Sequence, residues 1–337
     1  MATGRRRKPA ALGGAPQFPT PLEIVRPTLP ALSTFADRFA RGLASGMVTN
    51  HGPAAAEFEE RLSAWCGAPA ITCCNGQAAL LLMLRAAGVG GGEVIVPAYT
   101  FSATPHAVSW VGARPVFADI RRMVIDPADV ERRITADTAA ILAVDAYGLA
   151  CDYDALEDLG RRYGVKVLID SAPAFGTRVG GRPIGARGDA QAFSFHATKP
   201  FTTMEGGCVV SRDAGLIARA AALRNFGQVR GADCDEPGLN AKMMEVCALI
   251  GLEQLRGFDE VAAHRLGCAH RLRDGLAGIP GLELTCPPEG QEPVWLYFPV
   301  VVDPPAFGMT RDVLAELGYG ATEIDAILTH RFCSNGI

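Results

Sequence analysis

The sequence of 337 residues lacks features that define several large classes of protein. It has no apolar run close to the roughly 20 residues that span a bilayer, which argues against an integral membrane protein. Its formal net charge is only −4, so no excess of positive charge indicates nucleic acid as the main partner. Because 49% of the residues are apolar, the chain is too hydrophobic for a disordered protein. Its length allows one large domain, or a large and a small one.

Cysteine is plentiful, with ten residues, but no two of them form a C-x-x-C motif. Cys73, Cys74, Cys208 and Cys247 lie inside apolar segments. This distribution predicts buried free thiols in a reducing cytosol. A disulfide framework or a metal site is not expected, and the predicted location is cytoplasmic.

The N-terminal segment carries a basic run, Arg5 to Lys8, followed by four prolines between residues 9 and 21. The absence of an apolar core in this stretch argues against a signal peptide. We therefore expect residues 1–20 to form a disordered, solvated tail. An arm that contacts nucleic acid has only the charge in its favour.

Strand-like and helix-like patterns alternate from about residue 53 onward. The expected strands are near-continuous apolar runs, as is usual for buried parallel strands. This alternation predicts a mostly parallel central sheet covered by helices, an α/β fold. The expected strands are 69–74, 93–97, 114–120, 139–145, 165–170, 190–195 and 207–211, and the helices between them are 54–65, 76–87, 102–111, 126–134 and 152–163.

The pattern changes after residue 211. Long helices are expected at 214–225, 239–257 and 259–277, then a strand at 294–302 and a helix near 310–317. We interpret this change as a large domain, residues 21–257, followed by a smaller C-terminal α+β domain, residues 258–337.

Two of the expected strands end in residues suited to anion or cation binding, and ligands of open α/β sheets gather at such ends. Gly76 and Gln77 open a helix, where free N–H groups attract anions, although a glycine in a βα turn is weak support on its own. Asp170 ends a buried strand, where a carboxylate is costly unless it is paired. Its partner could be a protonated pyridine nitrogen, and a helix cap or a structural ion pair are the alternatives.

Lys199 follows a third strand, in the segment from Ser194 to Pro200. A single lysine is most often a solvated charge. A lysine beside an apolar pocket can instead have a lowered pKa and form a Schiff base. Ser194 adds a hydroxyl donor suited to phosphate.

These segments together resemble the DegT/DnrJ-type aminotransferases of fold type I, which use pyridoxal 5′-phosphate (PLP) on sugar nucleotides. The resemblance runs from about residue 21 to about residue 302. Each motif is weak alone, but their order and spacing are specific. Beyond the segments already described, it rests on residues 49–53, 93–101, 115–119, 125–127, 147–152, 205–207, 224–227 and 238–243.

The resemblance implies roles for five residues of the large domain. Lys199 would form the Schiff base with PLP, and Asp170 would bind its pyridinium nitrogen. Ser194 and the backbone around Gly76 and Gln77 would hold its phosphate.

The resemblance also implies partners. Phe101 would stack on the cofactor ring, although an ordinary core aromatic is the alternative. Asn240 would reach the phosphate of the partner subunit, which implies a homodimer with shared active sites. The amino donor would be glutamate and the acceptor a keto-sugar nucleotide, in the biosynthesis of amino sugars or natural products.

Three features depart from the family pattern. Gln77 stands where threonine is usual, and Pro173 stands where a His or Gln often contacts the phenolic oxygen of the cofactor. The family also normally continues some tens of residues further, and residues 329–337 do not resemble its usual ending. His196 lies three residues before Lys199, and no motif assigns it a role.

Three functions compete at this point. The leading one is a PLP-dependent transaminase. The second is a PLP-dependent dehydratase or aromatising enzyme on a sugar-derived substrate, for which some relatives carry His in place of the lysine. The third is a retired, non-catalytic paralogue, against which the retention of both Lys199 and Asp170 argues.

Overall fold

The computed structural model describes residues 15–16, 19–20, 25–230, 233–307, 310–316 and 320. Most of the expected basic tail, residues 1–20, and the atypical ending at 329–337 therefore lie outside the described residues. Within the described part of the chain, no helix combines the length and the apolar character needed to cross a membrane.

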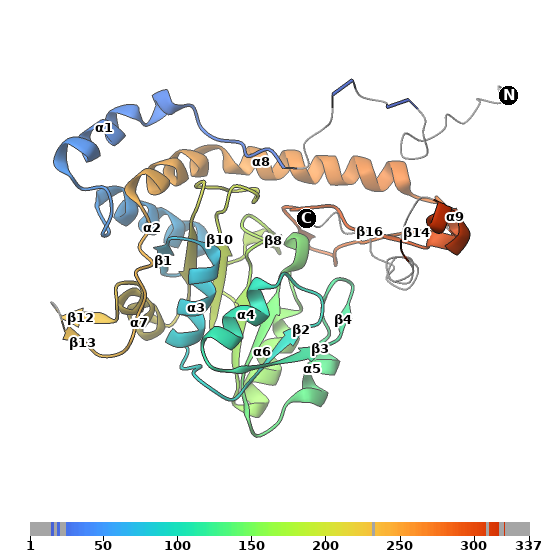
Figure 1. Cartoon of the computed structure of the whole chain (residues 1–337), viewed down its shortest axis with the longest axis horizontal. Helices are drawn as coiled ribbons and strands as arrows, with labels where there is room; N and C mark the ends of the chain where they lie inside the picture. The colour runs from blue at the N-terminus through green and yellow to red at the C-terminus, as the bar shows by residue number, and fades with distance from the viewer. Residues whose placement is uncertain are drawn as a thin grey trace.

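A seven-stranded sheet forms the centre of the molecule, in the order β1-β11-β10-β7-β6-β2-β3 (Figure 1). β11 runs antiparallel to both of its neighbours, and the other six strands are parallel to one another. The predicted, mostly parallel sheet is thus confirmed. Its strands are β1 (Ala70–Cys73), β2 (Glu93–Pro97), β3 (Arg114–Ala118), β6 (Thr138–Val144), β7 (Lys166–Asp170), β10 (Ala190–Ser194) and β11 (Gly207–Val210).

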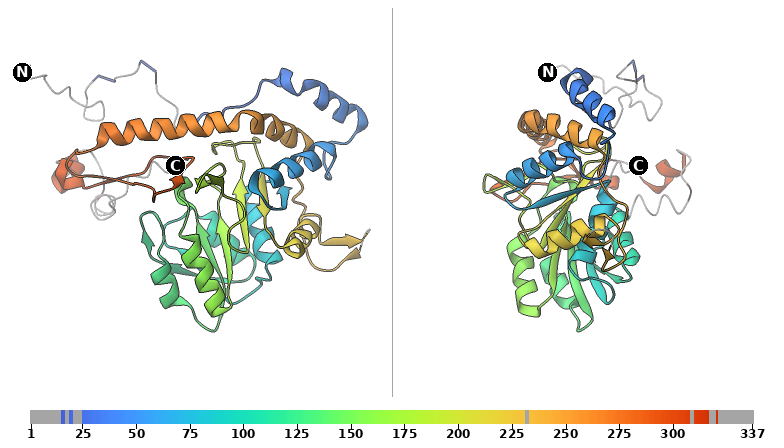
Figure 2. Two further views of the ribbon diagram at one scale, coloured as in Figure 1. Left: turned by 180° about the vertical axis from the view of Figure 1, so that it is seen from behind. Right: turned by 90° about the vertical axis from the view of Figure 1, so that its left-hand side faces the viewer.

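Helices cover both faces of this sheet, as the apolar runs of its strands require. One buried cluster joins the sheet to α3, α4 and α7, and a second joins it to α2, α5, α6 and α8. Seen from behind, α5 and α6 lie over the sheet (Figure 2). The helices are α2 (Pro53–Cys66), α3 (Gly76–Ala86), α4 (Ala103–Trp110), α5 (Pro127–Arg133), α6 (Tyr153–Tyr163), α7 (Ala214–Arg224) and α8 (Glu245–Leu276).

The helix α8 corrects one prediction. Two helices were expected, with a break near residue 258, but one helix runs from Glu245 to Leu276. Phe258 is fully buried at that point. The centroid of its ring lies 5.5 Å from that of Phe175 and 5.1 Å from that of Phe201. This burial accounts for a helix that continues through Gly257. The proposed boundary between residues 257 and 258 therefore falls inside α8, and the division into domains remains a proposal.

The C-terminal part of the described chain is built from short elements. α8 extends past the sheet towards β14, β16 and α9 (Figure 1). Only Val300–Val302 of the strand expected at 294–302 is a strand, because the chain turns at Trp295 with a positive φ of 51°. The remaining elements are α1 (Ala36–Ser45), β4 (Ile120–Arg121), β5 (Val124–Ile125), β8 (Arg178–Val179), β9 (Arg182–Pro183), β12 (Gln228–Arg230), β13 (Asp233–Cys234), β14 (Leu282–Leu284), β15 (Gln291–Glu292), β16 (Val300–Val302) and α9 (Arg311–Glu316), with short 3-10 turns between some of them.

The nine cysteines among the described residues are all free thiols. Burial raises the pKa of the Cys66 thiol to about 12. Of the four expected inside apolar segments, Cys74 is only half-buried. Burial does not extend to every cysteine, since Cys234 and Cys286 are exposed, and Cys333 lies outside the described residues.

Candidate active site

The sheet brings the predicted site residues to one edge. Asp170, at the end of β7, pairs with Ala192 of β10, two residues before Ser194. Gly207 of β11 pairs with Ser194 on one side and with Cys73 of β1 on the other. β1 is followed by α3, and β10 is followed by the segment that carries Lys199. The start of α3 and this segment therefore lie at the same edge of the sheet.

Asp170 is a buried carboxylate, only 4% exposed. Its Oδ2 accepts a hydrogen bond of 2.7 Å from the hydroxyl of Thr104, and its Oδ1 accepts one of 3.1 Å from the N–H of Ala172. Burial raises the pKa of this carboxyl group, which the hydrogen bonds and the attraction of Lys199 only partly offset. Among the described residues it forms no ion pair, so the structural ion pair considered from the sequence is absent there. A buried carboxylate without a cation fits a protonated ring nitrogen.

Lys199 is half-buried in the segment after β10, where its N–H donates to the carbonyl of His196 at 2.9 Å. Burial lowers the pKa of its amine, and the attraction of Asp170 acts in the opposite direction. A lysine that loses its proton more easily is a better nucleophile and a better base. These surroundings differ from those of a solvated surface lysine.

The start of α3 packs closely against Ser194. A Cβ atom added at Gly76 would lie 2.6 Å from Cβ and 2.8 Å from Oγ of Ser194, so only glycine fits there. Asn75 caps the helix by accepting from the N–H of Ala78 at 2.8 Å. The N–H groups of Gly76 and Gln77 donate to no acceptor in the described part of the chain, which leaves them free for a phosphate.

Gly76→Ala is expected to weaken cofactor binding roughly tenfold or more, because the new methyl group must push the turn away from Ser194 and misplace its N–H donors. The measurement is a titration of PLP into each purified variant. Gly91→Ala is the matched control, since a Cβ atom at Gly91 meets no atom within 4 Å. Equal affinities for the two variants would contradict the assignment of this turn.

His196 is already bonded within its own segment. Its Nδ1 accepts the N–H of Thr198 at 3.2 Å, which places the ring proton on Nε2, 3.4 Å from Glu205. These contacts tie the His196 side chain to its own segment and to Glu205. Pro173 is half-buried three residues after Asp170 and has no N–H to donate to a cofactor oxygen.

Phe101 and Asn240 are both exposed in the single chain. Phe101 is 67% exposed, so the alternative of an ordinary core aromatic is wrong. Asn240 is held by an isolated bridge to Asn225, on the segment that leads into α8. Exposure leaves both side chains available to a ligand or to another subunit.

Two buried residues beside Asp170 escaped the sequence analysis. Thr104, on α4, holds one oxygen of Asp170. Asp145 directly follows β6, and its carboxylate accepts from Ser171 Oγ at 2.6 Å, Tyr153 OH at 2.8 Å and the N–H of Cys151 at 3.0 Å. The same rule that selected Asp170, an acidic residue at a strand end, would have found Asp145.

Asp145 makes the stability of the protein depend on pH. Burial is the main cause that raises its pKa from 3.8 to about 6, so its favourable contribution is complete below pH 4 and is lost as the pH rises through 6. Between pH 4 and 7 the free energy of unfolding should therefore fall by about 2 kcal/mol relative to that of Asp145→Asn. Urea unfolding of both proteins at several pH values measures the difference. A constant difference would show that Asp145 does not titrate in this range.

Comparison with known proteins agrees with this geometry. A family model of the DegT/DnrJ/EryC1/StrS aminotransferase family matches residues 32–329. The dTDP-4-amino-4,6-dideoxy-D-glucose transaminase of Shigella dysenteriae is 35% identical over 87% of this chain and 80% of its own. The UDP-4-amino-4-deoxy-L-arabinose–oxoglutarate aminotransferase of Shewanella sediminis is 35% identical over 81% and 73%.

A solved structure of DesI, in the presence of its TDP-sugar product, has a TM-score of 0.83. It is 37% identical and covers 97% of this chain and 86% of its own. The PLP form of the putative sugar aminotransferase Spr1654 from Streptococcus pneumoniae has a TM-score of 0.76 at 29% identity, covering 84% and 78%. The chain therefore belongs to the DegT/DnrJ/EryC1/StrS aminotransferase family, and it is a PLP-dependent transaminase.

Proposed function

We propose that this enzyme transfers the amino group of glutamate to a keto-sugar nucleotide. The observation that supports this most is a buried carboxylate, Asp170, that forms no ion pair among the described residues and lies beside a lysine of lowered pKa, Lys199. The names of the relatives support the substrate class, since they combine amino-sugar nucleotides with a transaminase activity. One of those names also includes oxoglutarate, the product that glutamate leaves.

The residues at the sheet edge divide the work. Lys199 would attach the cofactor and then carry the proton between substrate and product carbons. Asp170 would hold the ring nitrogen in its protonated form, and Thr104 would orient Asp170. Gly76, Gln77 and Ser194 would bind the phosphate. When bound, PLP supplies an electron sink for the carbon that loses its proton.

The test is the reaction itself. The purified enzyme with PLP and glutamate should form oxoglutarate, and a keto-sugar nucleotide should then gain an amino group in stoichiometric amount. Mass analysis of the product separates amination from loss of water, the outcome expected for a dehydratase. Absence of both products with every nucleotide tried would contradict the proposal.

We infer that the active enzyme is a homodimer in which Asn240 serves the site of its partner. Large apolar side chains near Asn240 in the sequence are exposed in the single chain, which supports a covered interface. They are Phe226, Leu239 and Met244, at 48%, 40% and 55% exposed. The free thiols are in keeping with a cytoplasmic location.

A complementation experiment tests the shared site. Lys199→Ala and Asn240→Ala should each be impaired, but a mixed dimer contains one site with an intact Lys199 and an intact Asn240 from the partner. Mixing the two variants under conditions that exchange subunits should therefore restore activity, to about half of the wild-type value in each mixed dimer and about a quarter over the whole mixture after random exchange of equal amounts. Activity that stays at the average of the two variants would refute a shared site.

A further inference from the structure

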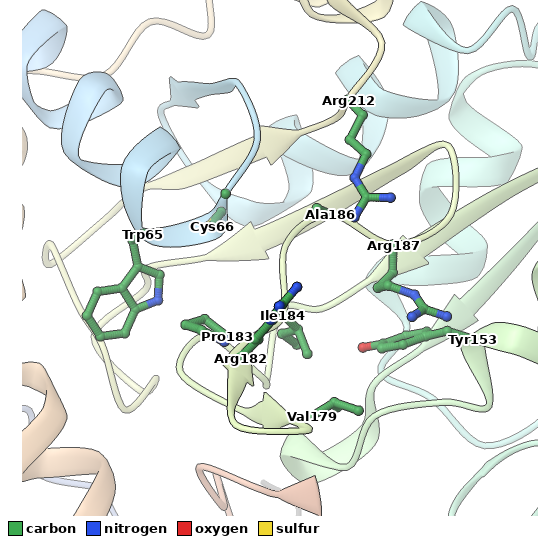
Figure 3. Close-up of a pocket in the computed structure, with 11 residues that line it drawn as sticks. Trp65, Cys66, Tyr153, Val179, Arg182, Pro183, Ile184, Ala186, Arg187 and Arg212 are labelled. Atoms are coloured by element: carbon green, nitrogen blue, oxygen red, sulfur yellow. The ribbon is translucent and has the colours of Figure 1, made fainter. Parts of the chain in front are cut away.

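A pocket of about 350 Å³ lies away from the candidate active site. Its walls come from the end of α2, the hairpin of β8 and β9, and the segments before β10 and after β11. None of the site residues described above lines it. Figure 3 shows three arginine side chains, Arg182, Arg187 and Arg212, that approach this space from separate segments.

The position of two of these arginines separates the pocket from Lys199. Arg187 precedes β10, and Arg212 follows β11, which runs antiparallel to β10. Both therefore lie near the amino end of β10, whereas Ser194 and Lys199 lie at its carboxyl end. Five residues of extended strand place these two ends roughly 13 Å apart.

The charged lining of the pocket is entirely positive, since it includes no Asp or Glu. Arg187 is held in place by Glu157, at 3.0 Å, and by Asp154, and its guanidinium lies 5.1 Å from the centre of the Tyr153 ring. Glu157 and Asp154 offset the charge of Arg187. The binding charge must therefore come from Arg182 and Arg212.

Arg182 and Arg212 are exposed and take part in no ion pair within the described part of the chain. Trp65 also lines the pocket, but its Nε1–H is buried and not exposed to solvent, so it offers no donor to a ligand there. The pocket thus holds two free guanidinium groups and no acidic lining residue. A ligand could supply the acceptors that these groups lack within the described residues.

We propose that this pocket binds the diphosphate group of a small molecule, at a site separate from the cofactor. Two free guanidinium groups on different segments match an anion with two adjacent charged groups, because guanidinium pairs with phosphate oxygens in bidentate fashion. The volume exceeds what one phosphate needs and lies at the lower end of pockets that hold small organic ligands. The diphosphate is either inorganic pyrophosphate or part of a nucleotide.

The test is calorimetric titration of the PLP-loaded enzyme with pyrophosphate, with uridine diphosphate and with inorganic phosphate. Saturable binding of at least one diphosphate, much tighter than that of phosphate, is expected. Similar affinities for the two diphosphates would identify the diphosphate group itself as the ligand, and tighter binding of uridine diphosphate would identify a nucleotide. No saturable binding of either, or phosphate binding as tightly as both, would overturn the proposal.

Four variants locate the site. Arg182→Gln and Arg212→Gln should each weaken diphosphate binding roughly tenfold or more, since each removes a charge-assisted contact. Arg61→Gln, an exposed change of equal charge on α2 outside the pocket, should leave the affinity unchanged. Ser194→Ala should also leave it unchanged, because Ser194 belongs to the cofactor site. Retention of binding in both pocket variants would place the diphosphate elsewhere and overturn the proposal, and a simultaneous loss in Ser194→Ala would place it at the cofactor site.

Discussion

Replacement of Lys199 by alanine should lower kcat for amino transfer by roughly 10⁴-fold, the upper end of the effect of a positioned acid–base group. By the roles proposed above, the variant loses both the amine that would attach the cofactor and the group that would move the proton. Its PLP-dependent absorbance should change as well, because PLP can no longer be bound through Lys199. Steady-state kinetics and an absorbance spectrum of the loaded protein measure the two effects separately.

The folded state should tolerate Lys199→Ala. Burial disfavours the charged amine, and its only resolved electrostatic partner is Asp170, so its removal costs little stability. Lys166→Ala is the matched control, since Lys166 is an exposed lysine paired with Asp189 at 2.7 Å. The control should keep full activity. A Lys199→Ala enzyme that turns over at the control rate would remove Lys199 from the mechanism.

Asp170→Asn should lower kcat by roughly 10²- to 10⁴-fold while the protein remains folded. Asparagine has the shape of the aspartate and can still accept one hydrogen bond, but it cannot stabilise a protonated ring nitrogen. Without the cofactor, the variant should be as stable as the wild type or more stable, because it removes a buried carboxylate whose burial cost Lys199 and its hydrogen bonds only partly offset. Steady-state kinetics of the PLP-loaded proteins test the predicted loss of kcat. Urea unfolding of the cofactor-free proteins tests the predicted stability.

Thr104→Val gives a graded comparison for Asp170→Asn. It removes the hydroxyl that donates to Oδ2 but leaves the charge, so its loss of activity should be much smaller. If Asp170→Asn loses no more activity than Thr104→Val, the charge of Asp170 is dispensable. Asp170 would then serve only to position its neighbours.

Much of the large domain could be predicted from local sequence. Buried parallel strands are short apolar runs, and helix starts carry visible signals, such as Asp126 before Pro127 in α5, where the Asp126 side chain accepts the N–H of Ala128. The helix α8 shows where such signals fail. Its continuity depends on the burial of Phe258 against side chains of the loops that follow β7 and β10, and this contact spans more than 50 residues.

The site divides in the same way. The sequence by itself singled out Lys199, Asp170, Ser194 and the Gly76 turn as candidates, because strand ends and glycine turns are local features and their order resembles that of the family. Only the tertiary structure decided that Gly207 joins these segments, that Thr104 supports Asp170, and that Phe101 is exposed. The protonation behaviour of these side chains was also decided only by the tertiary structure. The altered pKa values of Lys199 and Asp170 arise from burial, and burial is a property of the packed chain that no short segment carries.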